Sequence, residues 1–182
     1  MNKLLGSILI LSIIFTLSLG GYKILQSITH PIKYREIIES ISEDYNLDPS
    51  LVASVINVES SYKNLAKSPK NAIGLMQVKL STANYLNSLN NENNLSENNL
   101  YDPTTNILYG CRYLRYLIDK FDNTYTALAS YNAGETRVRS WLNDKNYSTD
   151  NKTLNYIPFR ETREYVEKVR KNINFYSKIY KN

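Results

Sequence analysis

The chain has 182 residues, of which 42% are hydrophobic and 21% charged, and its formal net charge is +5. This composition predicts one folded domain, since domains average about 100–200 residues. The single cysteine, Cys111, excludes an intrachain disulfide framework, and the single histidine, His30, excludes zinc sites built from several His or Cys ligands. Unless His30 takes part, Ser-His-Asp and Cys-His mechanisms are also excluded, so acid–base chemistry falls mainly to Asp and Glu. We expect neither a metal nor a cofactor.

Residues 4–22 form an apolar run with no charged side chain between Lys3 and Lys23. The run is close to the roughly 20 residues that span a bilayer as a helix, which favours an uncleaved membrane anchor. A secretory signal is the alternative, with Ser18 and Gly20 as small residues before the cut. Basic residues flank the run mainly on its C-terminal side, so the positive-inside rule alone does not place the following domain outside the cell.

The rest of the chain shows helical patterning and no competing strand pattern, which predicts a mainly α fold. We divide the chain into an anchor or signal segment (1–22), a short linker (23–34) and one domain (35–182). Helices are predicted over residues 33–45, 49–61, 81–89, 103–121, 124–131, 134–143 and 160–179.

Two of these helices have strong start signals, because Asp48-Pro49 and Asp102-Pro103 each place a capping aspartate before a proline. Residues 62–80 contain turn-forming residues and are predicted to form a loop or small hairpin. The asparagine-rich residues 87–99 are predicted to be a solvated loop.

Glu59 is an unusual carboxylate because of its position on the predicted helix 49–61. On a helical wheel it falls within about 60° of the apolar residues Val52, Val55 and Ile56. A carboxyl group on an apolar stripe loses hydration, which raises its pKa and keeps a general acid protonated near neutral pH. The alternative is an ordinary glutamate at a helix end whose carboxylate reaches solvent.

Four motifs accompany this glutamate in a fixed order. They are Val58-Glu59-Ser60 with Gly74-Leu75-Met76-Gln77; Asp102-Pro103 with Asn106-Ile107, Gly110 and Tyr113-Leu114; Ala129-Ser130-Tyr131-Asn132-Ala133-Gly134; and Ile157-Pro158-Phe159-Arg160-Glu161-Thr162-Arg163-Glu164-Tyr165-Val166. Together they resemble the catalytic domain of the soluble lytic transglycosylases, which has a lysozyme-like fold. The chain departs from the family pattern at Val78-Lys79-Leu80, which affects only the expected helix start at Ser81.

The resemblance implies cleavage of the β-1,4 bond between N-acetylmuramic acid (MurNAc) and N-acetylglucosamine (GlcNAc) in peptidoglycan glycan strands, without addition of water. By this analogy Glu59 protonates the leaving oxygen, the muramic N-acetyl carbonyl assists, and the ionised Glu59 then acts as base on the C6 hydroxyl. The product carries a 1,6-anhydro end.

Two other functions remain open: a hydrolysing muramidase, and an inactive wall-binding or assembly module. Goose-type lysozymes resemble the family but carry an additional aspartate that positions water. No Asp or Glu lies between Glu59 and Glu92, which favours the transglycosylase. Asp102, Glu135 or Glu161 could still fold back toward Glu59.

The motifs also imply a set of substrate-binding residues around the catalytic Glu59: Ser60, Met76, Gln77, Tyr131, Asn132, Glu161 and Tyr165. Among them, Ser60 would hold the catalytic loop or contact sugar, and Met76 would line the sugar groove. Gln77 would bind substrate amide or hydroxyl groups.

The later motifs imply the other roles. Tyr131 would place its hydroxyl near Glu59 or the N-acetyl group, and Asn132 would brace the turn before the next helix. Glu161 would lie near the cleft as an acidic residue, and Tyr165 would line the groove or simply pack.

Residues 160–182 hold seven Lys/Arg and three Glu, so most of the excess positive charge lies at the C-terminal end of the chain. A solvated helix face explains this charge more simply than an anionic partner does. We expect no nucleic-acid partner, because no binding motif is present. The resemblance places the domain outside the cytoplasm, as a monomer held by a single membrane pass or secreted after signal cleavage.

Overall fold

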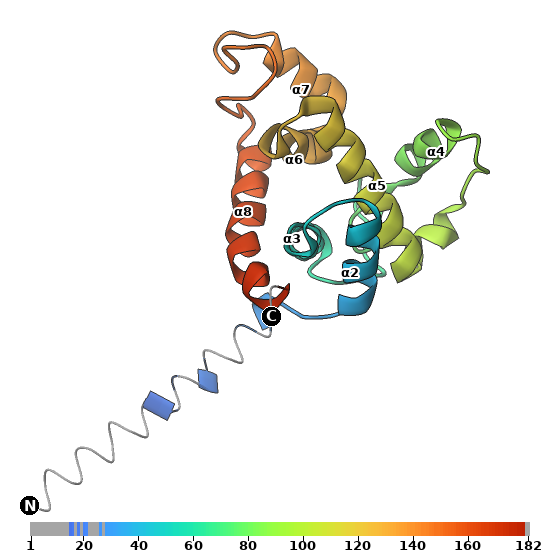
Figure 1. Ribbon diagram of the computed structural model, residues 1–182, viewed down its shortest axis with the longest axis vertical. Helices are drawn as coiled ribbons and strands as arrows, with labels where there is room; N and C mark the ends of the chain where they lie inside the picture. Colours follow the sequence, from blue (N-terminus) through green and yellow to red (C-terminus); the bar gives the residue numbers. More distant parts are fainter. Residues whose placement is uncertain (1–14, 17, 19, 22–25, 27, 181–182) are drawn as a thin grey trace, which may run out of the picture. The chain divides into compact units, whose positions relative to one another are not determined.

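The computed structural model describes residues 15–16, 18, 20–21, 26 and 28–180 (Figure 1). The chain divides into two units, residues 1–33 and 34–182, of which the second carries the features discussed below. The predicted anchor or signal segment, 1–22, lies mostly outside the described residues. Within the described part of the chain, no helix is both long enough and apolar enough to cross a membrane.

The second unit is mainly α-helical, which confirms the predicted fold class. Its elements in chain order are α2 (Arg35–Asp44), α3 (Pro49–Ser60), β1 (Ala72–Ile73), β2 (Val78–Lys79), α4 (Leu80–Ser88), the 3-10 helix η1 (Glu97–Tyr101), α5 (Pro103–Phe121), α6 (Thr124–Ala133), α7 (Glu135–Leu142) and α8 (Arg160–Tyr180).

Helix α3 packs between α8 on one side and α2 on the other (Figure 1). It begins where the sequence predicts, because the Asp48 carboxylate accepts a hydrogen bond of 2.8 Å from the Ser50 backbone N–H. Its middle turns are buried, with Val52, Val55 and Ile56 fully excluded from solvent. The helix therefore carries Glu59 in its last turn, at the edge of the core.

Strands β1 and β2 form an antiparallel hairpin between α3 and α4, pairing Ala72 with Lys79 and Ile73 with Val78. This is the small hairpin predicted within residues 62–80. Its turn requires Gly74, which has φ 77° and whose missing Cβ would lie 2.2 Å from the Asn106 side-chain nitrogen. The hairpin turn is thus pressed directly against α5.

Several boundaries differ by one or two residues from the sequence prediction, and three of the differences have a local cause. Helix α4 begins at Leu80 instead of Ser81, after Lys79, whose side chain makes no capping hydrogen bond. The asparagine-rich loop is shorter than predicted, because Ser96 and Asn99 form a capping box that starts η1.

The third difference concerns the functional motif, because α6 continues to Ala133 and only Gly134 separates it from α7. Gly134 has φ 90° and ψ 145°, a conformation that is open to glycine and strained for other residues. Asn132 and Ala133, predicted to lie between the two helices, consequently belong to the last turn of α6.

Candidate active site

Glu59 lies in the wall of a cavity of about 420 Å³ between α3 and α8. Burial raises the pKa of its carboxyl from 4.5 to about 7, and the neighbouring Tyr165 hydroxyl opposes this rise. The group can therefore hold a proton near neutral pH and also release it. The cavity is lined by Val58, Glu59, Asn132, Arg160, Glu161, Glu164, Tyr165 and Lys168.

Two tyrosines adjoin the Glu59 carboxyl group from different helices, Tyr165 from α8 and Tyr131 from α6. Burial, with a smaller contribution from the Glu59 charge, raises the pKa of both phenols well above 10.0. Both hydroxyls thus stay protonated. The Tyr165 hydroxyl is buried and forms no hydrogen bond of normal geometry within the described residues, but it lies close enough to Glu59 to lower the pKa of the carboxyl group.

The turn between the strands is tied to both α3 and α6. The Ser60 hydroxyl donates a hydrogen bond of 2.8 Å to the carbonyl oxygen of Leu75, which is the loop-holding alternative proposed for it. The Tyr131 hydroxyl donates one of 2.8 Å to the carbonyl oxygen of Met76. These bonds bring the first and third motifs together beside Glu59.

Met76 packs in the core of this structure. Its side chain is fully buried and lines neither of the two cavities, so its expected contact with the sugar groove stays a prediction. The physical reason for the burial is Gly110 in α5, whose missing Cβ would come within 2.3 Å of the Met76 sulfur. Because glycine has no side chain, the Met76 thioether can pack against α5 in the core.

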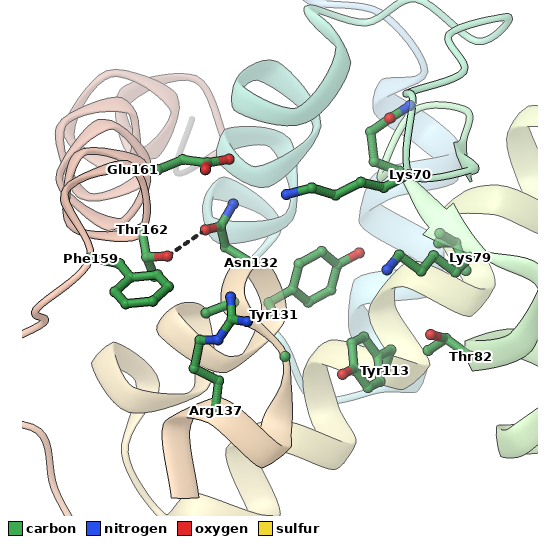
Figure 2. A pocket seen from close by; sticks show the side chains of 14 residues that line it. Lys70, Lys79, Thr82, Tyr113, Tyr131, Asn132, Arg137, Phe159, Glu161 and Thr162 are labelled. Carbon is green, nitrogen blue, oxygen red and sulfur yellow. Dashed lines mark hydrogen bonds between the residues drawn. The ribbon is translucent and has the colours of Figure 1, made fainter. Parts of the chain in front are cut away.

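A second cavity, of about 400 Å³, adjoins the first, because Asn132 and Glu161 line both (Figure 2). The Asn132 side-chain oxygen accepts a hydrogen bond of 2.8 Å from the Thr162 hydroxyl, so Asn132 joins α6 to α8. The second cavity, hereafter the groove, is lined by Lys70, Gln77, Val78, Lys79, Thr82, Tyr113, Tyr131, Asn132, Ala133, Gly134, Arg137, Phe159, Glu161 and Thr162.

Gln77 lines this groove, and its amide nitrogen donates hydrogen bonds to the carbonyl oxygens of Gly74 (2.9 Å) and Ala66 (3.3 Å). Its backbone has φ 48°, in the left-handed region. The amide nitrogen therefore stabilises the hairpin turn, and a substrate contact would fall to the amide oxygen.

The three carboxylates that could lie near Glu59 differ in their positions and partners. Asp102 caps α5 by accepting from the Thr105 N–H at 2.8 Å. Glu135 forms ion pairs with Lys120 (2.7 Å) and Arg139 (2.8 Å). Only Glu161 among these three reaches the cavity wall that contains Glu59, where it is exposed to solvent.

Sequence reasoning gave no role to several groove residues. Tyr113 and Phe159 stand inside the quoted motifs, and their aromatic side chains were the available signal. Lys70, Lys79 and Arg137 carried no signal, because they come from three elements that only the fold brings together.

The fold and the site together define a lysozyme-like helical domain with one partly buried glutamate in the wall of a cavity. The transglycosylase SLT domain family matches residues 36–155, and the chain belongs to this family. The chain is 33% identical over 154 residues to the soluble lytic murein transglycosylase of Escherichia coli K12, covering 83% of this chain and 23% of that protein. It is 41% identical over 101 residues to the membrane-bound lytic murein transglycosylase E of Buchnera aphidicola, covering 53% of this chain and 45% of that protein.

A solved structure of a lytic transglycosylase has a similar fold. An X-ray structure of an inactive mutant of lytic transglycosylase Slt from Pseudomonas aeruginosa superposes with a TM-score of 0.74 at 30% identity. The match covers 84% of this chain and 25% of that chain, so the present chain spans about a quarter of the length of its soluble relatives.

Proposed function

We propose that this protein is a peptidoglycan lytic transglycosylase that cuts the MurNAc-β-1,4-GlcNAc bond and leaves a 1,6-anhydro-muramic acid end. The observation that carries this proposal concerns Glu59. Its carboxyl group lines a cavity, and burial raises the pKa of this carboxyl to about 7. Family membership supports it, as do relatives named lytic murein transglycosylases.

In the first step the protonated Glu59 gives its proton to the glycosidic oxygen while the bond from that oxygen to muramic C1 breaks. The leaving GlcNAc takes up this proton as its 4-hydroxyl. The carbonyl oxygen of the muramic N-acetyl group bonds to C1 and forms an oxazolinium ion, so no second enzyme carboxylate is needed as nucleophile.

In the second step Glu59, now ionised, removes the proton from the muramic C6 hydroxyl. The C6 oxygen bonds to C1, and the bond from C1 to the N-acetyl oxygen breaks. Glu59 is protonated again at the end of the cycle, so one residue serves as acid and then as base. A carboxyl with a pKa of about 7 suits both roles near neutral pH.

A hydrolysing muramidase is the second candidate, because Glu161 lines the cavity with Glu59 and could position water. Against it, burial and the Tyr165 hydroxyl account for the Glu59 pKa, and no carboxylate of the described part of the chain contributes to it. Two carboxyl groups that act on one bond at close range would influence each other's pKa.

The direct test of the assignment is peptidoglycan solubilisation by the purified protein and by its Glu59→Gln variant. We expect the wild type to release soluble fragments and the variant to release none while keeping the circular dichroism spectrum of the wild type. Release of no fragments by the wild type would support an inactive wall-binding module instead.

We also propose that the domain acts outside the cytoplasmic membrane as a monomer and that residues 1–22 anchor it by a single pass. The apolar run 4–22 supports this, as does the existence of both soluble and membrane-bound relatives. Secretion after signal cleavage is the alternative. Carbonate extraction of membranes, N-terminal sequencing of the isolated protein and analytical ultracentrifugation test these three points.

A further inference from the structure

Three basic side chains from three separate elements line the groove beside α6. They are Lys70 in the loop before β1, Lys79 in β2 and Arg137 in α7. Figure 2 shows their charged ends directed into the groove from different sides. The positive charge at the C-terminal end of the chain plays no part in this arrangement, because none of the three belongs to α8.

These three cations have no ion-pair partner among the described residues of the protein. Some basic residues elsewhere form ion pairs, such as Arg112 with Glu92 at 2.8 Å. Arg137 instead lies over the ring of Phe159, with 4.9 Å from the guanidinium carbon to the ring centroid. This cation–π contact orients the guanidinium without cancelling its charge.

The acidic member of the groove wall is Glu161, which Figure 2 shows pointing into the same space from the α8 side. Three cations and one carboxylate are complementary to a ligand that carries several carboxylates and fewer amines. The peptide that extends from the lactyl group of muramic acid in peptidoglycan has this chemistry. The groove also adjoins the Glu59 cavity through Asn132, so one strand can reach both.

We propose, resting on the function proposed above, that the groove binds the stem peptide of the glycan strand through its free carboxylates. Lys70, Lys79 and Arg137 then set substrate specificity: strands with acidic stems are preferred over strands whose stem carboxylates are amidated. Because these charges are exposed, they act mainly by attracting and orienting the strand, so the preference appears in KM more than in kcat and weakens with salt.

The test compares two substrates with the same glycan chain, one with free stem carboxylates and one with amidated stems. The proteins are the full chain, the variant Lys70→Gln/Lys79→Gln/Arg137→Gln, and a control, Lys145→Gln/Lys152→Gln/Lys171→Gln. The control removes the same net charge from exposed lysines that line neither the groove nor the Glu59 cavity. Thermal unfolding shows that all three proteins are folded.

We expect the wild type and the control to show a KM about five- to tenfold lower for the acidic substrate at low salt, as several exposed charge pairs together would give. The groove variant should lose this preference, with a KM for the acidic substrate close to its KM for the amidated one. Equal KM values for both substrates with the wild type, or an unchanged preference in the groove variant, would overturn the proposal. An equal loss of preference in the control would also overturn it. Failure of the wild type to cleave either substrate would instead contradict the proposed function.

Discussion

The hydroxyl of Tyr131 in α6 donates its hydrogen to the carbonyl oxygen of Met76 in the hairpin turn, at 2.8 Å. One phenol has a single hydrogen to donate, so this bond commits Tyr131 to the turn. The Tyr165 hydroxyl has no hydrogen-bond acceptor of normal geometry among the described residues, so its hydrogen is available to the Glu59 carboxylate. The two tyrosines beside Glu59 therefore have different roles: Tyr131 stabilises the turn, and Tyr165 lowers the pKa of the Glu59 carboxyl group.

Tyr131→Phe should destabilise the domain, because the change leaves the buried Met76 carbonyl without its donor. The expected loss is about 1–3 kcal/mol in the free energy of unfolding, measured by urea denaturation. Tyr85→Phe is the matched control, since this tyrosine is exposed and its hydroxyl contacts another hydroxyl, that of Tyr116, at 3.3 Å. Equal stability of Tyr131→Phe and Tyr85→Phe would contradict the role assigned to the Tyr131 hydroxyl.

Glu59→Gln should stabilise the protein above neutral pH. The carboxyl has a pKa of about 7 when folded and near 4.5 when unfolded, so its ionisation disfavours the folded state increasingly as pH rises from about 4.5 to 7. This penalty is fully present above about pH 7, where it amounts to about 3 kcal/mol, and is absent below about pH 4.5.

Chemical denaturation of wild type and Glu59→Gln at about pH 5 and about pH 8 measures this penalty. The variant should gain stability relative to the wild type at the higher pH and little at the lower. Glu36→Gln on the exposed side of α2 controls for the loss of one surface carboxylate. A stability difference that does not change with pH would show that Glu59 is not buried as described.

Tyr165→Phe should raise the pKa of Glu59 further, because the hydroxyl that lowers it is removed while the burial remains. The alkaline limb of the pH profile of kcat/KM should then move to higher pH, since the acid form of Glu59 persists longer. Rates of peptidoglycan solubilisation across the pH range provide the measurement. A limb that moves to lower pH would contradict the interaction between the two residues.

Asn106→Ala should destabilise the domain more than any surface asparagine. Its side-chain oxygen accepts from the Met76 N–H at 2.8 Å, and its nitrogen donates to the carbonyl oxygens of Ile73 (2.8 Å) and Leu100 (2.7 Å). Each buried group left without a partner is worth about 1–3 kcal/mol. We expect the free energy of unfolding, measured by urea denaturation, to fall by at least about 3 kcal/mol. The control Asn98→Ala, at an exposed position, should change it little. Similar losses in both variants would contradict this bracing role.

The sequence predicts structure correctly where the determining contacts lie within a few residues. Asp48 and Asp102 start α3 and α5 as predicted, because capping depends on neighbours two or three residues away. The wheel position of Glu59 left two possibilities open, a dehydrated carboxyl with a raised pKa and an ordinary helix-end glutamate, and the burial in the structure favours the first. The motifs added Tyr131 and Tyr165, which the fold brings to the same carboxyl group.

Features that depend on packing between distant segments were not predictable. The burial of Met76 fits the space beside Gly110, which lies in α5, 34 residues later in the chain. The convergence of Lys70, Lys79 and Arg137 on one groove depends on how the hairpin and α7 pack around α6. No local pattern in the sequence encodes either relationship.

The most direct test of the central claim is mass spectrometry of the fragments that the wild-type protein releases from purified peptidoglycan. A lytic transglycosylase with Glu59 as its single acid and base adds no water, so the muramic ends should be 1,6-anhydro and lighter than hydrolysis products by one water. Fragments with reducing muramic ends would contradict this account and identify a hydrolase.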